Sequence, residues 1–417
     1  QGLMPTQWKN FAFWTGAILL LILATVFYQP AAAKTGSLLV WTRDRVYVMD
    51  IDTLDLVRIG PAKAGEPLTP SPGCFGQVEA PCWVVVSDRL YRVETGLASR
   101  SVPQAKLPVD PGYRWGEMPV SWSPDGLHLA YGLVRQKSRQ AELRVYSVET
   151  GELKIKAEFL DPTVAAAWSA ACVAGLEAEG CEIGFKQVAV ARIGEILPSL
   201  SPYAPATGET RRWTISPAPV ETLSWTASND LLYSRPDRLV YHAAEQTPAY
   251  EMPAGAQFAS LSPDGRYTVY YQPFKLKACS AVEEEACLYL GVWLRDSASP
   301  SSDPALIYSV KLSEQKEGLN FVPIWSSAGD AFVFFQEGRL IHYNLATAEA
   351  TIWYKAMRGK LRSLPLFSPD KEAVVFVDNQ GQGHSEYRLV IVNPRLEPIE
   401  HIIETDSGFR VLAWLPN

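Results

Sequence analysis

The six cysteines are the residues whose spacing most clearly predicts chemistry in this 417-residue sequence. None of them has the two-residue gap of a zinc knuckle or a thioredoxin-like site. They form three close pairs, separated by 8, 9 and 8 positions: Cys74 and Cys82, Cys172 and Cys181, Cys279 and Cys287. An even number of locally paired cysteines predicts three disulfides and therefore an oxidising compartment. Six free thiols in the core are the alternative interpretation.

No recognised catalytic motif accompanies these cysteines. The sequence has no GxSxG, HExxH, CxxCH or Walker pattern. The string nearest to a nucleophile motif, GHSEY at 383–387, lacks the final glycine. We therefore expect no catalytic, cofactor-binding or metal-binding residues, and a protein that is not an enzyme.

The remaining titratable residues that recur have structural interpretations. Asp125, Asp264 and Asp370 each follow a Ser-Pro pair, where a short carboxylate side chain caps a tight turn. His242 and His342 fall at comparable places in two repeats, and we interpret them as edge or core residues. The segment DNQGQG at 378–383 has one carboxylate, whereas calcium loops use several. We interpret it as a flexible connection.

The charge balance limits the class of partner. The net charge is −7, so the chain offers no broad surface that could neutralise phosphates. We expect no nucleic-acid partner.

The N-terminal segment predicts export. Residues 11–28 hold 18 positions without a charge, which is long enough for a membrane-spanning helix. The AAA at 31–33 also fits the small-residue rule for signal cleavage. We expect residues 1–33 to be an uncleaved signal-anchor helix, with residues 34–417 outside the cytoplasm, in the periplasm or at the cell surface. The alternative is cleavage after Ala33 and secretion.

The elements that must carry these residues are short strands in a repeated pattern. An aromatic residue or leucine precedes Ser-Pro-Asp-Gly or a variant, and an alternating apolar strand follows, as in SWSPDGLHLAYGL from 121 and SLSPDGRYTVYY from 260. A second strand pair with a polar turn follows each of these. Four strands per repeat, with a period near 40–50 residues, indicate β-propeller blades.

The SPDG strings at 123–126 and 262–265, with the TG turns at 95–96, 150–151 and 207–208, resemble the TolB-type and WD-like β-propeller repeat. The resemblance covers nearly everything after residue 37. It implies an all-β propeller and says little about function, because propellers host many unrelated activities.

We count eight second turns, which predicts an eight-bladed propeller over residues 34–417; seven blades are the alternative, because the blade around 61–104 has a poor first strand. The C-terminal segment FRVLAWLPN places Trp414 and Pro416 where other repeats have the aromatic residue and the proline. We therefore expect residues 408–415 to pair with the strand at 37–41 and close the ring, which removes two exposed sheet edges.

The longer connections are expected on one face, at 60–73, 103–117, 135–142, 272–287 and 378–386. Loops on a rigid scaffold commonly carry recognition. Two of these loops are candidate partner-binding loops because of their charged residues: Arg135, Lys137 and Arg139 in one, and Lys275, Lys277, Glu283, Glu284 and Glu285 in the other.

The expected function is a non-enzymatic, membrane-anchored, extracytoplasmic propeller that binds or scaffolds a protein as a subunit of an envelope or membrane complex. The alternative is a propeller that binds a ligand or glycan, or acts as a lyase or hydrolase, through its central channel.

Overall fold

The computed structural model describes residues 36–416, apart from the internal segments 43, 63–65, 77–78, 94–102, 116–119, 137, 139, 161–163, 191–195, 212, 215–221, 226–230, 235–238, 243–249, 252–255, 276–287, 297–302, 313–321, 356–359, 380–385 and 406–407. The expected anchor at residues 11–28 lies outside the described residues. Among the residues that are described, no helix is long and apolar enough to cross a membrane.

The described strands form eight antiparallel sheets, which we number along the chain. Their alternating apolar residues face neighbouring sheets, as short β-strands require. Sheet 1 contains β1 (Ser37–Thr42), β2 (Arg45–Asp50), β3 (Leu56–Pro61) and β34 (Phe409–Leu415). Sheet 2 contains β4 (Leu68–Pro70), β5 (Cys82–Val86), β6 (Arg89–Val93) and β7 (Pro103–Lys106). Sheet 3 contains β8 (Tyr113–Trp115), β9 (Ser121–Trp122), β10 (His128–Arg135), β11 (Gln140–Ser147) and β12 (Glu152–Leu160). Sheet 4 contains β13 (Val164–Trp168), β14 (Ile183–Val190), β15 (Ile196–Ala204), β16 (Glu209–Thr210) and β17 (Trp213–Thr214).

The second half of the chain continues the same pattern. Sheet 5 contains β18 (Thr222–Trp225), β19 (Leu231–Ser234), β20 (Leu239–His242) and β21 (Tyr250–Glu251). Sheet 6 contains β22 (Gln257–Leu261), β23 (Tyr267–Lys275), β24 (Leu288–Asp296) and β25 (Ala305–Lys311). Sheet 7 contains β26 (Ile324–Trp325), β27 (Ala331–Gln336), β28 (Arg339–Asn344) and β29 (Glu349–Tyr354). Sheet 8 contains β30 (Lys360–Phe367), β31 (Val374–Asn379), β32 (Glu386–Val392) and β33 (Ile399–Glu404).

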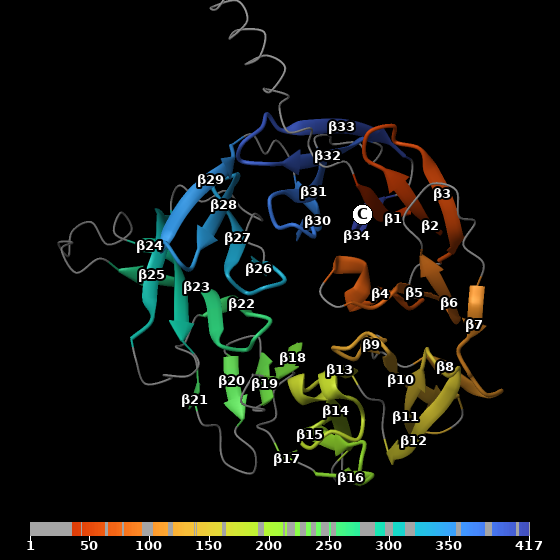
Figure 1. The fold of residues 1–417 in the computed structure, drawn as a ribbon. Helices are drawn as coiled ribbons and strands as arrows, with labels where there is room; N and C mark the ends of the chain where they lie inside the picture. Colours follow the sequence, from red (N-terminus) through yellow and green to blue (C-terminus); the bar gives the residue numbers. More distant parts are fainter. Residues whose placement is uncertain are drawn as a thin grey trace, which may run out of the picture.

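The sheets are arranged around a common centre (Figure 1). We count the strand nearest the centre as the first strand of each sheet; these are β34, β4, β9, β13, β18, β22, β26 and β30, and the strands at the opposite edge of each sheet lie outermost. Because neighbouring strands are antiparallel, first and second strands are joined at one face, which we call the turn face. The connections from second to third strand, and from sheet to sheet, lie at the opposite face, which we call the loop face.

The core consists of layers between neighbouring sheets. Leu38 and Val411 of sheet 1 pack in one cluster with Val375 of sheet 8, and Leu39 packs with Val84 of sheet 2. Each layer consists of the apolar face of one sheet packed against the apolar face of the next, and a single sheet could not bury its own face. The stability of one sheet therefore depends on its neighbours.

Sheet 1 is assembled from distant parts of the chain. β34 pairs with β1 in antiparallel register, with Leu38 opposite Trp414 and Thr42 opposite Phe409. No turn joins these two strands, which lie at opposite ends of the sequence. The pairing predicted for 408–415 with 37–41 is therefore present.

Two of the connections expected on the loop face are shorter than predicted. Within 60–73, residues Leu68–Pro70 are the first strand of sheet 2, and Ser71 begins a turn at the turn face. Within 103–117, Pro103–Lys106 is the fourth strand of sheet 2 and Tyr113–Trp115 is a strand of sheet 3. All three strands have at most four residues, and two of them contain proline, so the alternation that reveals a strand is hidden.

Candidate functional site

A buried serine follows the first strand in six sheets of the described chain. Each hydroxyl accepts a hydrogen bond from a backbone N–H at the start of the second strand, such as the 2.8 Å bond from Tyr267 N to Ser262 Oγ. The hydroxyl then donates to a group within the turn, which is Asp264 Oδ1 at 2.5 Å in this case. The six serines are Ser71, Ser123, Ser169, Ser262, Ser326 and Ser368.

The repeated aspartates are acceptors in these turns. Asp370 Oδ1 accepts from Ser368 at 2.6 Å and also from the backbone N–H of Glu372. Asp264 Oδ1 likewise accepts the N–H of Arg266. The interpretation of Asp125, Asp264 and Asp370 as turn caps is confirmed, and these carboxylates hold turns instead of forming an acid–base pair.

Two of the three predicted disulfides are present, and both replace such a turn. Cys74–Cys82 and Cys172–Cys181 close loops directly after Ser71 and Ser169. These loops carry the short 3-10 helices η1 (Pro72–Phe75) and η2 (Ala170–Ala174). The third pair, Cys279 and Cys287, lies outside the described residues.

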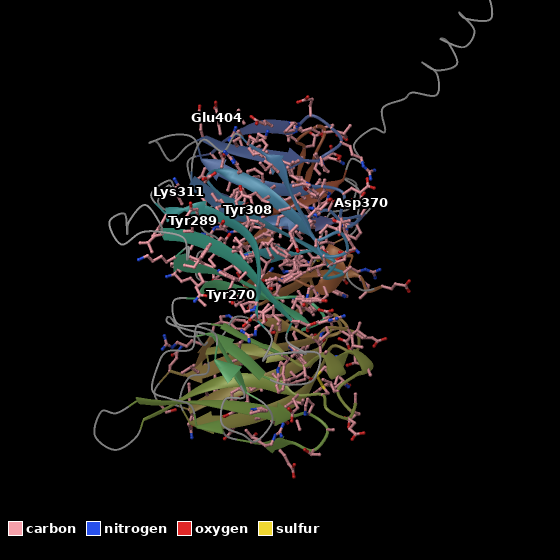
Figure 2. The ribbon with its side chains drawn as sticks, turned by 90° about the vertical axis from the view of Figure 1, so that its left-hand side faces the viewer. Tyr270, Tyr289, Tyr308, Lys311, Asp370 and Glu404 are labelled. Atoms are coloured by element: carbon pink, nitrogen blue, oxygen red, sulfur yellow. A yellow bond between two sulfur atoms is a disulfide. The ribbon has the colours of Figure 1, made fainter. Side chains whose placement is uncertain are left out.

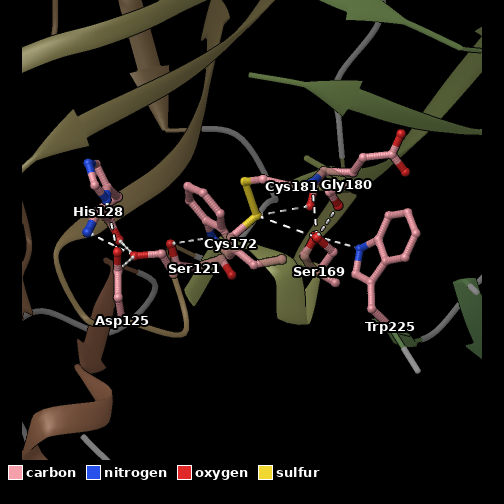
Figure 3. Close-up of a disulfide and its surroundings, with 12 residues drawn as sticks. Ser121, Asp125, His128, Ser169, Cys172, Gly180, Cys181 and Trp225 are labelled. Carbon is pink, nitrogen blue, oxygen red and sulfur yellow. Dashed lines mark hydrogen bonds and ion pairs between the residues drawn. A yellow bond between two sulfur atoms is a disulfide. The ribbon is translucent and has the colours of Figure 1, made fainter. Parts of the chain in front are cut away.

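The disulfide loops keep the serine and exchange the aspartate for a backbone acceptor. Ser169 Oγ accepts from Glu182 N at 3.0 Å and donates to Gly180 O at 2.9 Å. Figure 3 shows this arrangement beside Cys172 and Cys181. The disulfide therefore braces a longer connection in which the serine keeps the same role.

Ser123, Asp125 and His128 bring together the residue types of a hydrolase triad, but the contacts are those of a turn. Ser123 donates its proton to Asp125 and accepts from the backbone N–H of His128 at 2.9 Å. His128 Nδ1 lies 3.5 Å from the other oxygen of Asp125 (Figure 3). A nucleophilic serine must instead donate to the imidazole and be accessible, and Ser123 is fully buried.

Tryptophans of the first strands connect neighbouring sheets. Trp168 Nε1 donates to Ser121 O of the preceding sheet at 3.2 Å, and Trp225 Nε1 donates to Ala167 O at 3.0 Å. Trp122 and Trp325 make the same contact with Thr69 O and Ser260 O. The tryptophan of the repeat therefore has a structural role: it links the innermost strands of neighbouring sheets.

Arg144 of sheet 3 and Arg388 of sheet 8 are buried and form ion clusters with carboxylates. Arg144 donates to Glu142 at 2.9 Å through Nε, to Pro108 O at 2.7 Å, and to Asp110. The hydrogen bond and charge of Arg144 lower the pKa of Asp110. Burial acts to raise the pKa of Glu142, but hydrogen bonds from Tyr113 and Arg144 outweigh it, so this pKa is lowered.

The second cluster contains the only carboxylate of the DNQGQG segment. Asp378 is fully buried and accepts from Arg388 Nε at 2.9 Å. Arg388 Nη1 also reaches Glu400 Oε2 at 3.2 Å, and Tyr354 donates to Glu400 at 2.5 Å. Asp378 is therefore engaged by an arginine, which leaves it unsuitable as a calcium ligand. Among the described residues, no group of three or more His, Cys, Asp or Glu side chains could hold a metal ion.

His342 is an aromatic packing residue. Its ring stacks on Trp353 with centroids 4.1 Å apart and planes inclined by 9°. Burial lowers the pKa of His342 to about 4. The imidazole is therefore neutral at pH 7, which agrees with its interpretation as an edge or core residue. The side chain of His242 lies outside the described part.

The candidate loop residues are only partly described. Arg135 is exposed and its Nη1 donates to Gln140 Oε1 at 3.1 Å. Lys275 is exposed at the end of β23. The remaining candidates lie outside the described residues: Lys137, Arg139, Lys277, Glu283, Glu284 and Glu285. The structure does not bring the two loops together through the residues that it describes.

An aromatic cluster lies on sheet 6, where the segment 276–287 leaves and rejoins the sheet. Phe274 contacts Tyr289 and Trp293, with centroid distances of 5.8 and 5.4 Å. Leu306, which is 43% exposed, completes the cluster on β25. We call Phe274, Tyr289, Trp293 and Leu306 the sheet 6 surface.

Gly291 allows these side chains to meet. A Cβ atom there would lie 2.6 Å from Trp293 Nε1, 2.8 Å from Leu306 Cδ1 and 3.1 Å from Phe274 Cε1. Lys311 is paired with Tyr289 across the strands and is exposed. Figure 2 shows Tyr289 and Lys311 toward the left-hand edge, on the opposite side of the molecule from Asp370 of the turn face. Sequence analysis missed this surface, although the alternation Tyr289, Gly291, Trp293 was a signal for it.

Comparisons with known proteins inform the fold. No protein-family model matches the chain, and no curated protein matches it in sequence. A solved structure of the eukaryotic initiation factor has a TM-score of 0.50 and 10% identity, and the match covers 91% of this chain and 98% of that one.

Two further solved structures are similar over most of their length. The Dos1 propeller has a TM-score of 0.48 and 11% identity, covering 86% of this chain and 93% of that one. An oligogalacturonate lyase from Vibrio parahaemolyticus has a TM-score of 0.45 and 12% identity, covering 84% and 83%. The arrangement of antiparallel sheets around a common centre is that of a β-propeller, and the similarity to the initiation-factor structure concerns the fold alone. The comparisons do not distinguish a TolB-type repeat from other propeller repeats.

Proposed function

We propose that this chain is a non-enzymatic propeller, held at the outer face of a membrane, that binds a protein partner through the sheet 6 surface and the adjoining segment 276–287. The observation that carries the proposal is an accessible aromatic and aliphatic cluster beside exposed Lys311. Aromatic residues dominate the binding energy of protein interfaces, and exposed apolar clusters commonly mark interaction sites.

The polar chemistry of the described residues supports a binding module over an enzyme. Serine hydroxyls and aspartates after the first strands are engaged in turns. The buried arginines Arg144 and Arg388 are paired with carboxylates. Groups that hold the fold together in this way are poorly placed to react with a substrate.

We further propose that the eight sheets are eight blades of one closed ring with a TolB-like repeat, anchored through residues 11–28. The pairing of β34 with β1 supports closure, because it supplies sheet 1 with its innermost strand. The two disulfides support an oxidising compartment outside the cytoplasm.

The test is native mass spectrometry of the full chain extracted from its membrane in mild detergent. We expect a stoichiometric protein partner with the unaltered chain and its loss with Leu306→Asp. The matched control is Ile352→Asp, at a residue that is 39% exposed on the fourth strand of sheet 7. The proposal is wrong if no partner is present, or if both substitutions have the same effect.

A further inference from the structure

Three exposed apolar side chains occupy the same position in three consecutive sheets. Phe258, Val322 and Leu364 each lie four residues before a buried serine of the turn. They are 43%, 37% and 47% exposed, respectively. An aromatic or aliphatic residue that recurs at one repeat position without being buried is not explained by the packing of the fold.

These residues lie around the centre of the molecule. β22, β26 and β30 are the innermost strands of sheets 6, 7 and 8 (Figure 1). Each of these strands runs toward the turn face, so Phe258, Val322 and Leu364 lie toward the loop face. Trp325 Nε1 donates to Ser260 O at 3.4 Å and joins β26 to β22. We call Phe258, Val322 and Leu364 the axial arc.

Two residues of the axial arc, Phe258 and Leu364, lie in β-bulges. In β22 the register shifts between Gln257 and Ser260, so Phe258 lies within the bulge. In β30 it shifts between Ser363 and Leu366, so Leu364 lies within the bulge. Bulges redirect side chains and are frequent beside functional sites.

The backbone of Phe258 is also strained. Its φ is 50°, in the left-handed region that a bulky side chain rarely adopts. Its ring meets Tyr271 edge-on, with centroids 6.2 Å apart, yet much of it remains accessible. Strain of this kind persists where the surrounding structure enforces it, and it clusters at binding sites.

The charged residues on the innermost strands indicate which kind of partner this surface would bind. The sequences of β22, β26, β30 and β34 contain Lys360, Arg362 and Arg410 and no carboxylate, although the chain as a whole is acidic. Arg410 is exposed, and its guanidinium lies 5.6 Å from the centre of the Trp41 ring. Arg410 lies on β34, which contacts the innermost strand β30 that carries Leu364. An apolar arc with a cation on the neighbouring innermost strand is complementary to apolar side chains flanked by carboxylates.

We propose that the axial arc and Arg410 bind an acidic protein segment that inserts apolar side chains at the loop-face end of the centre. This surface is separate from the sheet 6 surface, and its test does not require the partner proposed above. The inserted side chains cover Phe258 and Leu364, and the carboxylates of the segment approach Arg410.

The probes are three fluorescein-labelled synthetic peptides of about twelve residues. The first alternates leucine or phenylalanine with glutamate, the second replaces glutamate by lysine, and the third replaces the apolar residues by serine. Fluorescence anisotropy with the purified full chain measures their affinities. We expect the first peptide to bind at least about tenfold more tightly than the others, which corresponds to ~1.4 kcal/mol.

The decisive variant is Phe258→Gly, because glycine removes the side chain and accepts the positive φ, so folding is preserved. We expect it and Leu364→Ser to weaken the first peptide at least about tenfold, and Arg410→Gln to weaken it and reduce its salt dependence. Ile402→Ser, at an exposed residue of the outermost strand β33, is the control and should change nothing. Absent or equal binding of all peptides, or full binding to Phe258→Gly, overturns the proposal.

Discussion

At the scale of single residues, the buried serine is the unit that repeats most faithfully. Ser169 and Ser262 have different partners within the turn, Gly180 O and Asp264, yet both accept the backbone N–H that starts the second strand. Such a hydroxyl satisfies a buried donor that the sheet ladder leaves unpaired. The turn sequence can therefore vary as long as the serine stays.

We predict that Ser262→Ala lowers the free energy of unfolding by about 1–3 kcal/mol, because it leaves the buried N–H of Tyr267 without its acceptor. Denaturant titration measures the change. Ser309→Ala, at an exposed position of β25, should leave stability within about 0.5 kcal/mol of the original. Equal effects of the two substitutions would refute the role of the serine.

His342 predicts a dependence of stability on pH. Its pKa of about 4 in the folded chain lies below the ordinary value of 6.5, so between these values the unfolded chain binds more protons. Stability from this group is present above pH 6.5 and is lost as the pH falls toward 4. The slope is at most about 1.4 kcal/mol per pH unit, and partial exposure of the imidazole reduces it.

His342→Phe keeps an aromatic ring against Trp353 and removes the proton site. We expect the unaltered chain to lose more unfolding free energy than this variant between pH 7 and pH 5, measured by denaturant titration at each pH. Parallel losses in the two proteins would show that His342 does not control this dependence.

At the scale of elements, the two described disulfide loops are extended versions of the short Ser-Asp turn. Both leave the first strand through a serine and return to the second strand beside a cysteine, as at Ser71 and Cys82. The loop that begins at Ser71 also reaches other sheets. A Cβ atom on Gly76 would lie 3.4 Å from Pro369 and 3.8 Å from Pro416, so this loop borders the junction of sheets 8 and 1.

We predict that Cys172→Ala with Cys181→Ala lowers the free energy of unfolding by about 2–3 kcal/mol, because the cross-link restricts the unfolded chain. Thermal unfolding with and without a reductant measures the effect. The reductant should destabilise the unaltered chain more than the double variant. If it destabilises both equally, the Cys172–Cys181 bond contributes no measurable stability.

Much of this element level could be predicted from sequence because the signals are local. Three cysteine pairs predicted the two disulfides that are described, and SPDG strings predicted turns at Asp125 and Asp264. The first strand of sheet 2 was obscured because β4 has three residues and ends at Pro70. The serine network was also missed, since its partners lie up to 13 residues apart at Ser169 and Glu182.

The candidate surfaces were harder to predict. The two charged loops were recognised by their composition, whereas the sheet 6 surface depends on three strands meeting over Gly291. The axial arc requires knowledge of which strands lie innermost and where bulges turn Phe258 and Leu364 outward. A one-residue change in register reverses the side of a strand on which a residue lies, so sequence alone does not determine these exposures.

At the scale of the whole molecule, β34 ties the end of the chain to its first described strand. Leu415, Ala413 and Trp414 are buried against neighbouring strands. The hydrogen bonds of this pairing are the only backbone link between β34 and the rest of sheet 1 among the described residues. Sheet 1 therefore depends on a strand of seven residues for its innermost position.

We predict that a chain ending at Gly408, without β34, loses cooperative thermal unfolding, because it exposes β1 as an edge and removes the partners of Leu38 and Leu39. Differential scanning calorimetry measures this outcome. A chain without Pro416 and Asn417 is the control and should keep a cooperative transition. A melting temperature unchanged by removal of β34 would contradict its role.

The same pairing makes the molecule suitable for circular permutation. Ser37 lies directly opposite Leu415, so in a chain from which residues 1–35 and 417 are removed, a short linker from Pro416 to Gly36 would give sheet 1 the connectivity of its neighbours. New ends opened in the exposed turn between Ala346 and Thr347 would lie in a surface turn, where such rearrangements are tolerated. A permuted chain of this kind that folds would show that the order in which the chain forms the sheets is separable from their arrangement.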